Sequence, residues 1–317
     1  MKEIISSLDI GSSTVKLVVG EVYNNEVNVL SVSEVKSKGV KKGLIVNPEE
    51  TLISLKEVFS RTEEMLNIKI NKVLLTIPSY YAEFLVVEGS TTIRNEDGIV
   101  DGNDIVSVLQ SSVYNKVPNN KEFVSIMPIE FILDDTEKVK DPKGMKASKM
   151  TCKAVVSLAP KKNVYTAVSL LENLGVSIVD INFGGLADYY EFKTSDHDKK
   201  NVAVVNIGEE KTEVSIFKKG IMIETENIEI GGKNIDRDIC YIYDISRKKA
   251  KTLKEKFALA SKRNASTSWS EDVVTNTNEN IKISQYELSE IINSRIKEIL
   301  ELVKKQINLL TKMEISY

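Results

Sequence analysis

The chain has 317 residues, of which 42% are hydrophobic and 28% charged, with a formal net charge of −3 and a pI near 5.6. This length allows two domains with separate cores, and the slightly acidic balance excludes a global basic field that would attract nucleic acid. Two distant cysteines, a single histidine (His197) and the lack of an apolar run near the roughly 20 residues that span a bilayer predict a cytoplasmic protein without a disulfide framework, zinc site or catalytic triad.

The first 78 residues predict a mixed α/β layer with the order three strands, helix, strand. The strands are "EIISSLDI", "TVKLVVGEVY" and "EVNVLSVSEV", with a tight hairpin turn at Asn24-Asn25. A helix is expected over residues 48–66, because Asn47 is a good N-cap and Pro48 suits the first helical position. The strand at 72–78 follows.

Between residues 79 and 158 the pattern changes to long strands around one helix, expected from Asp101 to Tyr114. This change indicates a small inserted α+β module. The earlier pattern then resumes with a helix that Gly175 ends. The polar run at 193–200 marks the start of a second lobe, and His197 within it is interpreted as a loop residue.

The second lobe repeats the opening of the first. The stretch "VVNIGEEKTEVSIF" (204–217) echoes "SSLDIGSSTVKLVV" (6–19), so that Asn206 and Gly208 stand where Asp9 and Gly11 stand. The last helix is expected to begin at a capping box of Ser284 with a glutamate three residues later, and its broad apolar stripe is interpreted as core.

The two repeated turns are candidate phosphate-binding sites. A hairpin turn built from a glycine and small hydroxyl residues presents backbone N–H groups to which a phosphate can bind. Two such hairpins facing each other would hold the phosphates of a nucleotide between two lobes. The aspartate of the first turn, Asp9, would hold a hydrated magnesium ion, which takes few protein carboxylates.

At these residues the chain resembles the FtsA family of actin-like bacterial cell-division proteins, over essentially its whole length. The resemblance rests on "LDIGSSTVKLVVGE", "GVKKGLIVNPEE", "IEIGGKNIDRDI" and "DPKGM" (141–145), the last being specific to that family among actin-like folds. It implies an α/β actin-like two-lobed fold with repeated β-meander and helix halves. Lobe I (1A) would comprise 1–78 and 159–192, inserted subdomain 1C 79–158, an incomplete lobe II (2A) 193–238, and helical subdomain 2B 239–317.

The resemblance also implies a site for ATP and magnesium, with Asp9 as the magnesium ligand. The nucleotide-binding candidates are Asp9, Gly11, Ser12, Ser13, Lys16, Gly208, Thr212, Gly231, Gly232 and Lys254.

The chain departs from the family in this site. The family's second turn reads roughly Asp-Ile-Gly-Gly-Gly-Thr-Thr-Asp, whereas residues 206–213 read Asn-Ile-Gly-Glu-Glu-Lys-Thr-Glu. Asn206 offers no carboxylate to organise a metal. Glu209 and Glu210 remove backbone freedom and place two negative charges where phosphates would sit, and Lys211 would offset part of that charge. This turn should repel a nucleotide.

Two further departures from the family's sequence also predict a weaker nucleotide site. Gly184 falls where the family has a polar residue that orients the attacking water, and the family's Ala-Glu-x-x-Lys becomes Ala-Lys-Thr-Leu-Lys at 250–254. The sequence also stops before the family's glycine-rich adenine turn and its amphipathic membrane helix, so we expect no membrane anchor in this chain and weak or absent ATP hydrolysis. A truncated or fragmentary FtsA explains the stop, but it does not explain Asn206, Gly184 or the two glutamates.

The leading hypothesis is a division-site adaptor at the inner face of the cell membrane. By resemblance it binds the C-terminal tail of FtsZ through 2B, with Arg295 near the peptide, and it binds other division proteins through 1C and associates with itself. Without the resemblance, Arg295 would be an exposed helix arginine paired with a neighbouring glutamate. The alternatives are an active actin-like ATPase or kinase, which lacks a visible carboxylate near Asn206 and a base, and the actin-like adaptor of type IV pilus assembly, which "DPKGM" disfavours.

Overall fold

The structure is a computed structural model that describes residues 3–24 and 26–311. The chain forms two compact units. The first holds the residues up to 204 together with 215–226 and the end of the chain from Leu310, and the second holds 205–214 and 227–309. The four-part division predicted from the sequence, with its boundaries at 78, 158, 192 and 238, remains a prediction.

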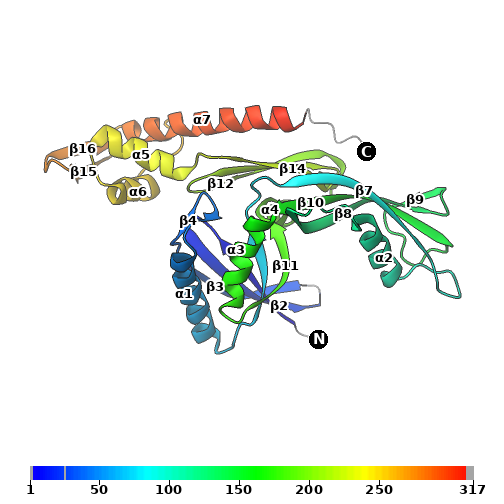
Figure 1. The fold of residues 1–317 in the computed structure, drawn as a ribbon. Helices are drawn as coiled ribbons and strands as arrows, with labels where there is room; N and C mark the ends of the chain where they lie inside the picture. Colours follow the sequence, from blue (N-terminus) through cyan, green and yellow to red (C-terminus); the bar gives the residue numbers. More distant parts are fainter. Residues whose placement is uncertain (1–2, 25, 312–317) are drawn as a thin grey trace. The chain divides into compact units, whose positions relative to one another are not determined.

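The first unit contains a five-stranded sheet in the order β11-β6-β1-β2-β3 (Figure 1). The first three strands form the predicted antiparallel meander, while β6 runs parallel to β1 and β11 runs parallel to β6. The bounds are β1 Glu3–Ile10, β2 Thr14–Tyr23, β3 Glu26–Lys36, β6 Lys72–Ile77 and β11 Ser177–Phe183. The expected order of three strands, helix and strand is confirmed. Asn24 adopts the left-handed conformation that its hairpin requires, and the second residue of that predicted turn lies outside the described residues.

Two helices cover the face of this sheet that carries Leu8, Leu17 and Leu75, all fully buried. The first, α1 (Pro48–Leu66), begins where the Asn47 side chain accepts a hydrogen bond from the Glu50 N–H at 3.3 Å, as predicted. The second is α3 (Lys161–Glu172), and α4 (Gly184–Phe192) follows β11. A short hairpin of β4 (Val40–Lys41) and β5 (Leu44–Ile45) precedes α1.

The inserted α+β module is present as predicted. Its antiparallel sheet has the order β7-β10-β8-β9, and helix α2 packs on β7 and β10. A Cβ at Gly89 would lie 2.2 Å from the Ser112 nitrogen, so α2 packs directly on the strand backbone. The helix is one residue shorter at each end than expected, with Asp101 as its N-cap. The bounds are β7 Glu83–Thr92, α2 Gly102–Val113, β8 Lys121–Leu133, β9 Glu137–Val139 and β10 Lys149–Pro160.

The polar run at 193–200 is held by hydrogen bonds. The buried Tyr189 donates its hydroxyl hydrogen to Asp198 at 2.9 Å, and the Lys193 ammonium lies 3.1 Å from the same carboxylate. His197 lies in a short 3₁₀ helix (His197–Lys199) rather than an irregular loop, and its Nδ1 accepts from the Thr194 N–H at 3.2 Å.

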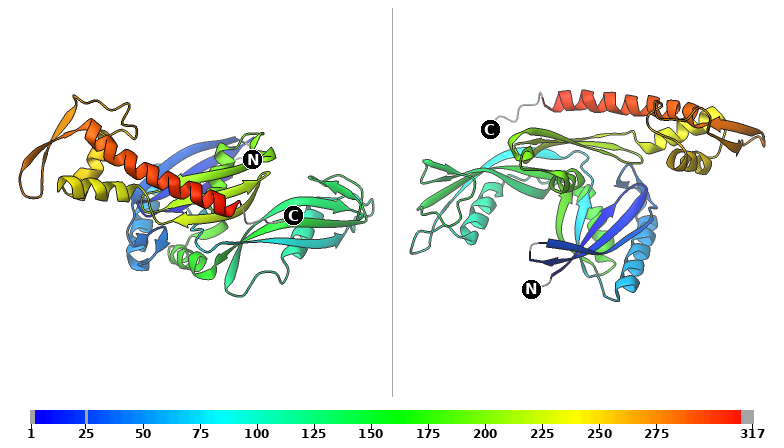
Figure 2. Two further views of the ribbon diagram at one scale, coloured as in Figure 1. Left: turned by 90° about the horizontal axis from the view of Figure 1, so that it is seen from above. Right: turned by 180° about the vertical axis from the view of Figure 1, so that it is seen from behind.

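The meander then recurs as predicted. Strands β12, β13 and β14 form a sheet in that order, as β1, β2 and β3 do. The remaining elements, α5, α6, the hairpin β15–β16 and α7, belong to the second unit, and Figure 2 shows the hairpin leading into the start of α7. The bounds are β12 Asn201–Ile207, β13 Thr212–Lys218, β14 Ile221–Ile228, α5 Gly232–Tyr243, α6 Arg247–Lys256, β15 Ser270–Val274, β16 Asn280–Ser284 and α7 Gln285–Leu310.

The core of the second unit lies between its helices and the hairpin. Ile239 of α5, Leu253 of α6, Ile283 of β16 and Leu288 of α7 belong to one buried cluster. Of the predicted capping box of the last helix, one hydrogen bond is present, because the Ser284 hydroxyl accepts from the backbone N–H three residues later at 3.1 Å. No helix within residues 3–24 and 26–311 has the length and apolar character needed to cross a membrane.

Candidate functional site

The first turn joins β1 to β2 and is tightly closed. The Gly11 N–H donates to the Thr14 carbonyl at 3.0 Å, and a Cβ at Gly11 would lie 2.9 Å from that oxygen. The segment after β3 braces the turn, since the Ser12 hydroxyl accepts from the Gly43 N–H at 2.6 Å. The Ser13 carbonyl likewise accepts from the Ser37 N–H at 2.9 Å. The turn is therefore preformed by the fold of the first unit.

A row of polar residues crosses the sheet beside this turn. Asp9 stands opposite Lys16 on β2 and opposite Thr76 on β6, so the three side chains share one face. Thr76 in turn stands opposite Asn182 on β11 and donates its hydroxyl hydrogen to the Asn182 amide oxygen at 3.3 Å. The carboxylate, hydroxyl and amide oxygens of this row suit a hydrated magnesium ion, and Lys16 suits a phosphate.

Sequence reasoning missed Thr76 and Asn182. Both lie near the carboxyl ends of parallel strands, where ligands bind in open α/β sheets, and that position was the available signal. Gly184 begins α4 beside the row, and a Cβ there would make only an ordinary contact of 3.6 Å with the Thr76 methyl group. Space therefore does not require a glycine, and a polar side chain would fit.

The second turn has the same backbone geometry as the first. The Gly208 N–H donates to the Lys211 carbonyl at 2.9 Å, and a Cβ at Gly208 would lie 3.1 Å from that oxygen. The predicted structural repeat is thus present down to the hydrogen bond. Asn206 occupies the position that Asp9 occupies in the first turn.

The surroundings of the second turn differ, because α5 begins directly against it. The Gly232 N–H donates to the Gly208 carbonyl at 2.9 Å, and the Lys233 N–H donates to the Glu209 carbonyl at 2.7 Å. A Cβ at Gly231 would lie 2.5 Å from the Gly208 oxygen. The N–H groups of a helix N-terminus form a natural anion site, but here two of them bind the turn itself.

Two other residues predicted to bind the nucleotide here make hydrogen bonds within the second unit. The Gly231 N–H donates to the Asn234 side chain at 3.1 Å. The Thr212 side chain is fully buried, and its hydroxyl donates to the Ile230 carbonyl at 2.8 Å. Gly231 and Thr212 therefore hold the turn together within the second unit.

Lysines accompany the acidic residues of the turn. Glu210 pairs with Lys233 of α5, and a Glu209 carboxylate oxygen lies 3.9 Å from the Lys251 ammonium of α6. Lys211, expected to offset the charge of the two glutamates, instead places its ammonium 2.6 Å from Glu213 and 2.6 Å from the Asn227 side chain. The local charge is thus balanced mainly by lysines from the two helices.

Lys254 of α6 contacts residues of α5. Its ammonium is 2.6 Å from an Asp236 carboxylate oxygen and donates to the Gly232 carbonyl at 3.2 Å. The nucleotide-binding residues predicted in the second unit lie together around the start of α5: Gly208, Thr212, Gly231, Gly232 and Lys254. Those predicted in the first unit lie together at the turn between β1 and β2: Asp9, Gly11, Ser12, Ser13 and Lys16.

The two turns differ in how well they fit a nucleotide. The polar row and closed turn of the first unit fit a magnesium ion and a phosphate. In the second unit the N–H groups of Gly231, Gly232 and Lys233 already have acceptors, and two carboxylates lie on the turn. Those residues do not fit a bound triphosphate.

Arg295 lies on α7 with 25% of its side chain exposed. Its guanidinium makes a bidentate pair with Asp238 of α5, with N–O distances of 2.6 and 2.7 Å, and it also pairs with Glu298. The hydrogen bond to Asp238 is the main cause that raises the pKa of Arg295. Within the described residues, Arg295 is therefore committed to acidic partners of its own unit.

The Cys152 thiol is buried in the inserted module. Burial raises the pKa of the Cys152 thiol to about 12, so this cysteine stays protonated and unreactive. Over residues 3–24 and 26–311 no group of three or more His, Cys, Asp or Glu side chains is placed to hold a metal ion.

The two strand-turn-strand units at the heads of two meanders define an actin-like fold. Solved structures with this similarity include the PilM-PilN type IV pilus biogenesis complex, with a TM-score of 0.61, 12% identity and coverage of 98% of this chain and 78% of that chain. MreB5 of Spiroplasma citri bound to AMPPNP gives a TM-score of 0.54 at 16% identity, covering 99% of this chain and 80% of that chain. At such identities the likeness concerns the fold alone.

Sequence comparisons show which proteins of this fold the chain is similar to. The model for the cell division protein FtsA matches residues 203–316, and the model for the SHS2 domain inserted in FtsA matches residues 81–157. Cell division protein FtsA of Bacillus subtilis is 29% identical over 306 residues, covering 96% of this chain and 70% of that protein. The Streptococcus pneumoniae protein is 28% identical over 303 residues, covering 96% and 66%. The chain is an FtsA-like protein of the actin-like fold.

Proposed function

We propose that this chain is a cell-division adaptor that binds the C-terminal tail of FtsZ through its helices α5–α7, with weak or absent ATP hydrolysis. The relatives support the division role, because six proteins named cell division protein FtsA match at 25–29% identity, about twice the 12% of the pilus protein. The pilus-assembly alternative therefore has only the shared fold in its favour.

The second turn is the observation that carries the proposal of weak hydrolysis. The actin-like superfamily binds a nucleotide with magnesium, and in this chain Asp9, Lys16, Thr76 and Asn182 would hold the magnesium and a phosphate. The second turn carries the carboxylates of Glu209 and Glu210, which would repel a phosphate bound to that turn. The lysines that could attract that phosphate are already paired with these carboxylates.

We place the protein at the division site, in the cytoplasm at the inner face of the cell membrane. The module that matches the SHS2 model is the proposed contact for other division proteins and for self-association. An adaptor of this kind needs a folded surface for its partners and does not need turnover. Such an adaptor does not need the residues that serve hydrolysis, which agrees with the changes at Asn206 and Gly184.

Two measurements test the proposal. A labelled FtsZ tail peptide from the same genome should bind the purified protein with an affinity on the order of micromolar to tens of micromolar, because the tail must order itself on binding. Magnesium-dependent phosphate release should not exceed that of an Asp9→Ala control. Absence of peptide binding would refute the adaptor role, and turnover that Asp9→Ala abolishes would refute the proposal of weak hydrolysis.

A further inference from the structure

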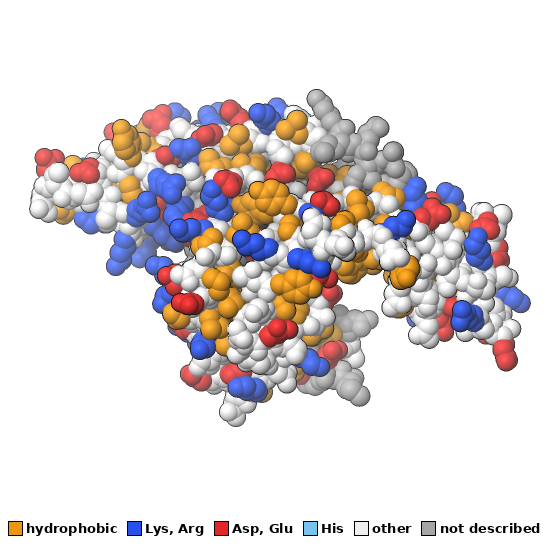
Figure 3. Space-filling model, viewed as in Figure 1, with side chains coloured by type: hydrophobic (Ala, Val, Ile, Leu, Met, Phe, Trp, Pro, Cys, Tyr) orange, Lys and Arg blue, Asp and Glu red, His pale blue; other side chains and the backbone are white. Residues whose placement is uncertain are grey.

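A cavity of 610 Å³ lies within the first unit. Three segments enclose it: the β4–β5 hairpin with the start of α1, the ends of β1 and β6, and the start of α3. Figure 3 shows hydrophobic side chains, with Lys or Arg side chains among them, on the face where Figure 1 draws α3 and the start of β7. The volume falls within the roughly 300–1,000 Å³ of small-molecule sites, and one water would fill only about 30 Å³ of it.

Apolar side chains form most of the cavity wall. They come from all three segments and include Ile10, Leu44, Ile45, Pro78 and Ala167. Ile10 and Ala167 are also buried in the core of the unit, so the wall is continuous with that core. A ligand with an apolar body would therefore lose much of its contact with water on entering the cavity, which is the main source of affinity at such sites.

Hydrogen bonds hold the three segments in place. The Asn163 amide, at the start of α3, donates to the Tyr80 carbonyl at 2.9 Å. The Lys121 ammonium donates to the Tyr81 carbonyl at 2.7 Å. The β4–β5 hairpin is tied to the turn between β1 and β2 by the serine hydroxyl described above. The cavity is therefore preformed by the fold, and a preformed site loses little conformational entropy on binding.

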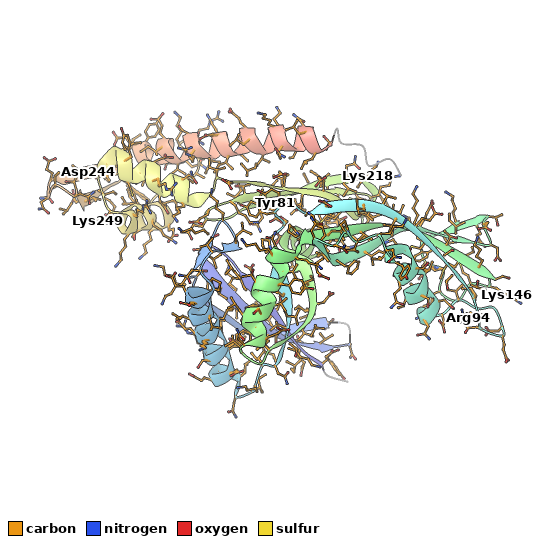
Figure 4. The ribbon with its side chains drawn as sticks, viewed as in Figure 1. Tyr81, Arg94, Lys146, Lys218, Asp244 and Lys249 are labelled. Carbon is orange, nitrogen blue, oxygen red and sulfur yellow. The ribbon has the colours of Figure 1, made fainter. Side chains whose placement is uncertain are left out.

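Tyr81 lines the cavity in a strained backbone conformation. Its φ is 57°, in the left-handed region that is unfavourable for a bulky side chain. Tyr81 is 80% exposed, so it lies at the rim, and Figure 4 labels it just before the start of β7. Strained residues are concentrated at binding sites, where the surrounding structure holds them. An exposed ring at the rim offers a flat surface on which an aromatic ligand can stack.

The charges around the cavity favour an anion. Lys162, on the first turn of α3, lines the cavity and is exposed. It has no ion-pair partner within residues 3–24 and 26–311. No Asp or Glu of the described chain lines the cavity, and the first turn of α3 contains no acidic residue. A single cation without a counter-charge is complementary to one negative group on a ligand.

We propose that this cavity binds a small aromatic molecule that carries one carboxylate. The apolar wall and the Tyr81 ring would contact the aromatic body, and the Lys162 ammonium would pair with the carboxylate. The site goes beyond the adaptor role, because its lining contains no residue of α5–α7 among those described. Of the described lining residues, only Thr76 also belongs to the polar row beside the first turn, so the cavity adjoins the candidate nucleotide site and is distinct from it.

The polar groups of the wall favour a compact ligand over an extended peptide. A peptide brings backbone N–H and C=O groups that need partners when they leave water. The Thr76 and Thr166 hydroxyls and the Asn163 amide already donate to acceptors within the fold, at 3.3, 2.8 and 2.9 Å. A ligand with few hydrogen-bonding groups outside its carboxylate suits this wall better.

The test uses the full chain and two probes with the same rings, 2-naphthoate and the neutral 2-naphthamide. Lys162→Gln removes the cation, and its matched control is Lys161→Gln, because Lys161 is exposed on the same helical turn and does not line the cavity. Tyr81→Asn removes the ring. Since asparagine tolerates the left-handed conformation better than tyrosine, this variant should unfold at a temperature equal to or above that of the parent. A loss of binding then cannot be ascribed to unfolding.

Binding is measured by titration calorimetry, and for the parent we expect a Kd for naphthoate on the order of 0.1–1 mM. The amide should bind the parent about threefold more weakly. Lys162→Gln should lower the affinity for naphthoate to that for the amide and leave the amide unchanged, while Lys161→Gln binds like the parent. Tyr81→Asn should weaken both probes by a similar factor, about threefold or more.

Four results would overturn this inference. The first is no binding of naphthoate to the parent at millimolar concentration, and the second is parental affinity for naphthoate in both Lys162→Gln and Tyr81→Asn. The third is displacement of naphthoate by ATP with magnesium, which would assign the cavity to the nucleotide site. The fourth is tighter binding of octanoate than of naphthoate, which would show that the choice of an aromatic ligand is wrong.

Discussion

Lys254 holds Asp236 in an ion pair of 2.6 Å, with only 18% of the lysine side chain and 7% of the aspartate side chain exposed. The same ammonium donates to the Gly232 carbonyl at the start of α5. The lysine that the sequence assigns to the nucleotide site therefore fastens α6 to α5. Removing one partner of such a pair leaves a poorly solvated charge, which costs more than the pair itself contributes.

Replacing this lysine should destabilise the second unit in the absence of any nucleotide. We expect Lys254→Met to lower the free energy of unfolding by about 3 kcal/mol, measured by urea denaturation, because Asp236 loses its partner. Lys56→Met, at an exposed position of α1, should change it by less than about 0.5 kcal/mol. Adding Asp236→Leu to Lys254→Met should recover much of the loss. Equal stability of the two single variants would show that the pair is not structural.

The contact between the second turn and α5 predicts a specific glycine requirement. A Cβ at Gly231 would lie 2.5 Å from the Gly208 oxygen and 2.8 Å from the Glu209 oxygen, both backbone atoms that cannot rotate away. Gly231→Ala should therefore cost about 2 kcal/mol of stability and speed amide hydrogen exchange in the turn. Gly102 provides the control, because a Cβ there meets nothing within 4 Å, and Gly102→Ala should be neutral or slightly stabilising. Similar results for both alanines would contradict this packing.

Local features of the fold could be predicted from the sequence because they depend on neighbouring residues. The Asn47 cap, the Ser284 cap and the meander that begins each lobe follow from patterns within a few residues. The ion pairs could not be predicted in this way, since Glu210 and Lys233 are 23 residues apart. The Thr76–Asn182 contact joins residues 106 positions apart, and only the strand order brings them together.

Restoring the second turn should improve nucleotide binding. In the triple variant, Glu209→Gly and Glu210→Gly remove two carboxylates and release Lys233 and Lys251 for a phosphate, while Asn206→Asp adds one carboxylate that could organise a metal. We expect a higher affinity for ATP with magnesium, with a larger gain at low salt, measured with a fluorescent nucleotide. A control with Glu209→Gln and Glu210→Gln removes the charges without adding backbone freedom, so it separates repulsion from the shape of the turn. No gain in either variant would show that a different part of the site limits binding.

Arg295 requires a test that separates its ion pairs from any contact with the FtsZ tail. Because Asp238 holds the guanidinium with two hydrogen bonds, Arg295→Ala alone leaves Asp238 unpaired and should destabilise the α5–α7 contact by about 1–2 kcal/mol. A weaker affinity of that variant for the tail would then have two explanations, the loss of a contact with the tail and the loss of stability.

The combined variant Arg295→Ala with Asp238→Ala removes both charges, so most of the stability should return. If Arg295 acts only within the fold, the combined variant binds the labelled tail peptide like the parent, which is the result we expect from the pairing seen here. If the combined variant is stable yet binds the peptide at least tenfold more weakly than the parent, Arg295 or Asp238 contacts the tail directly.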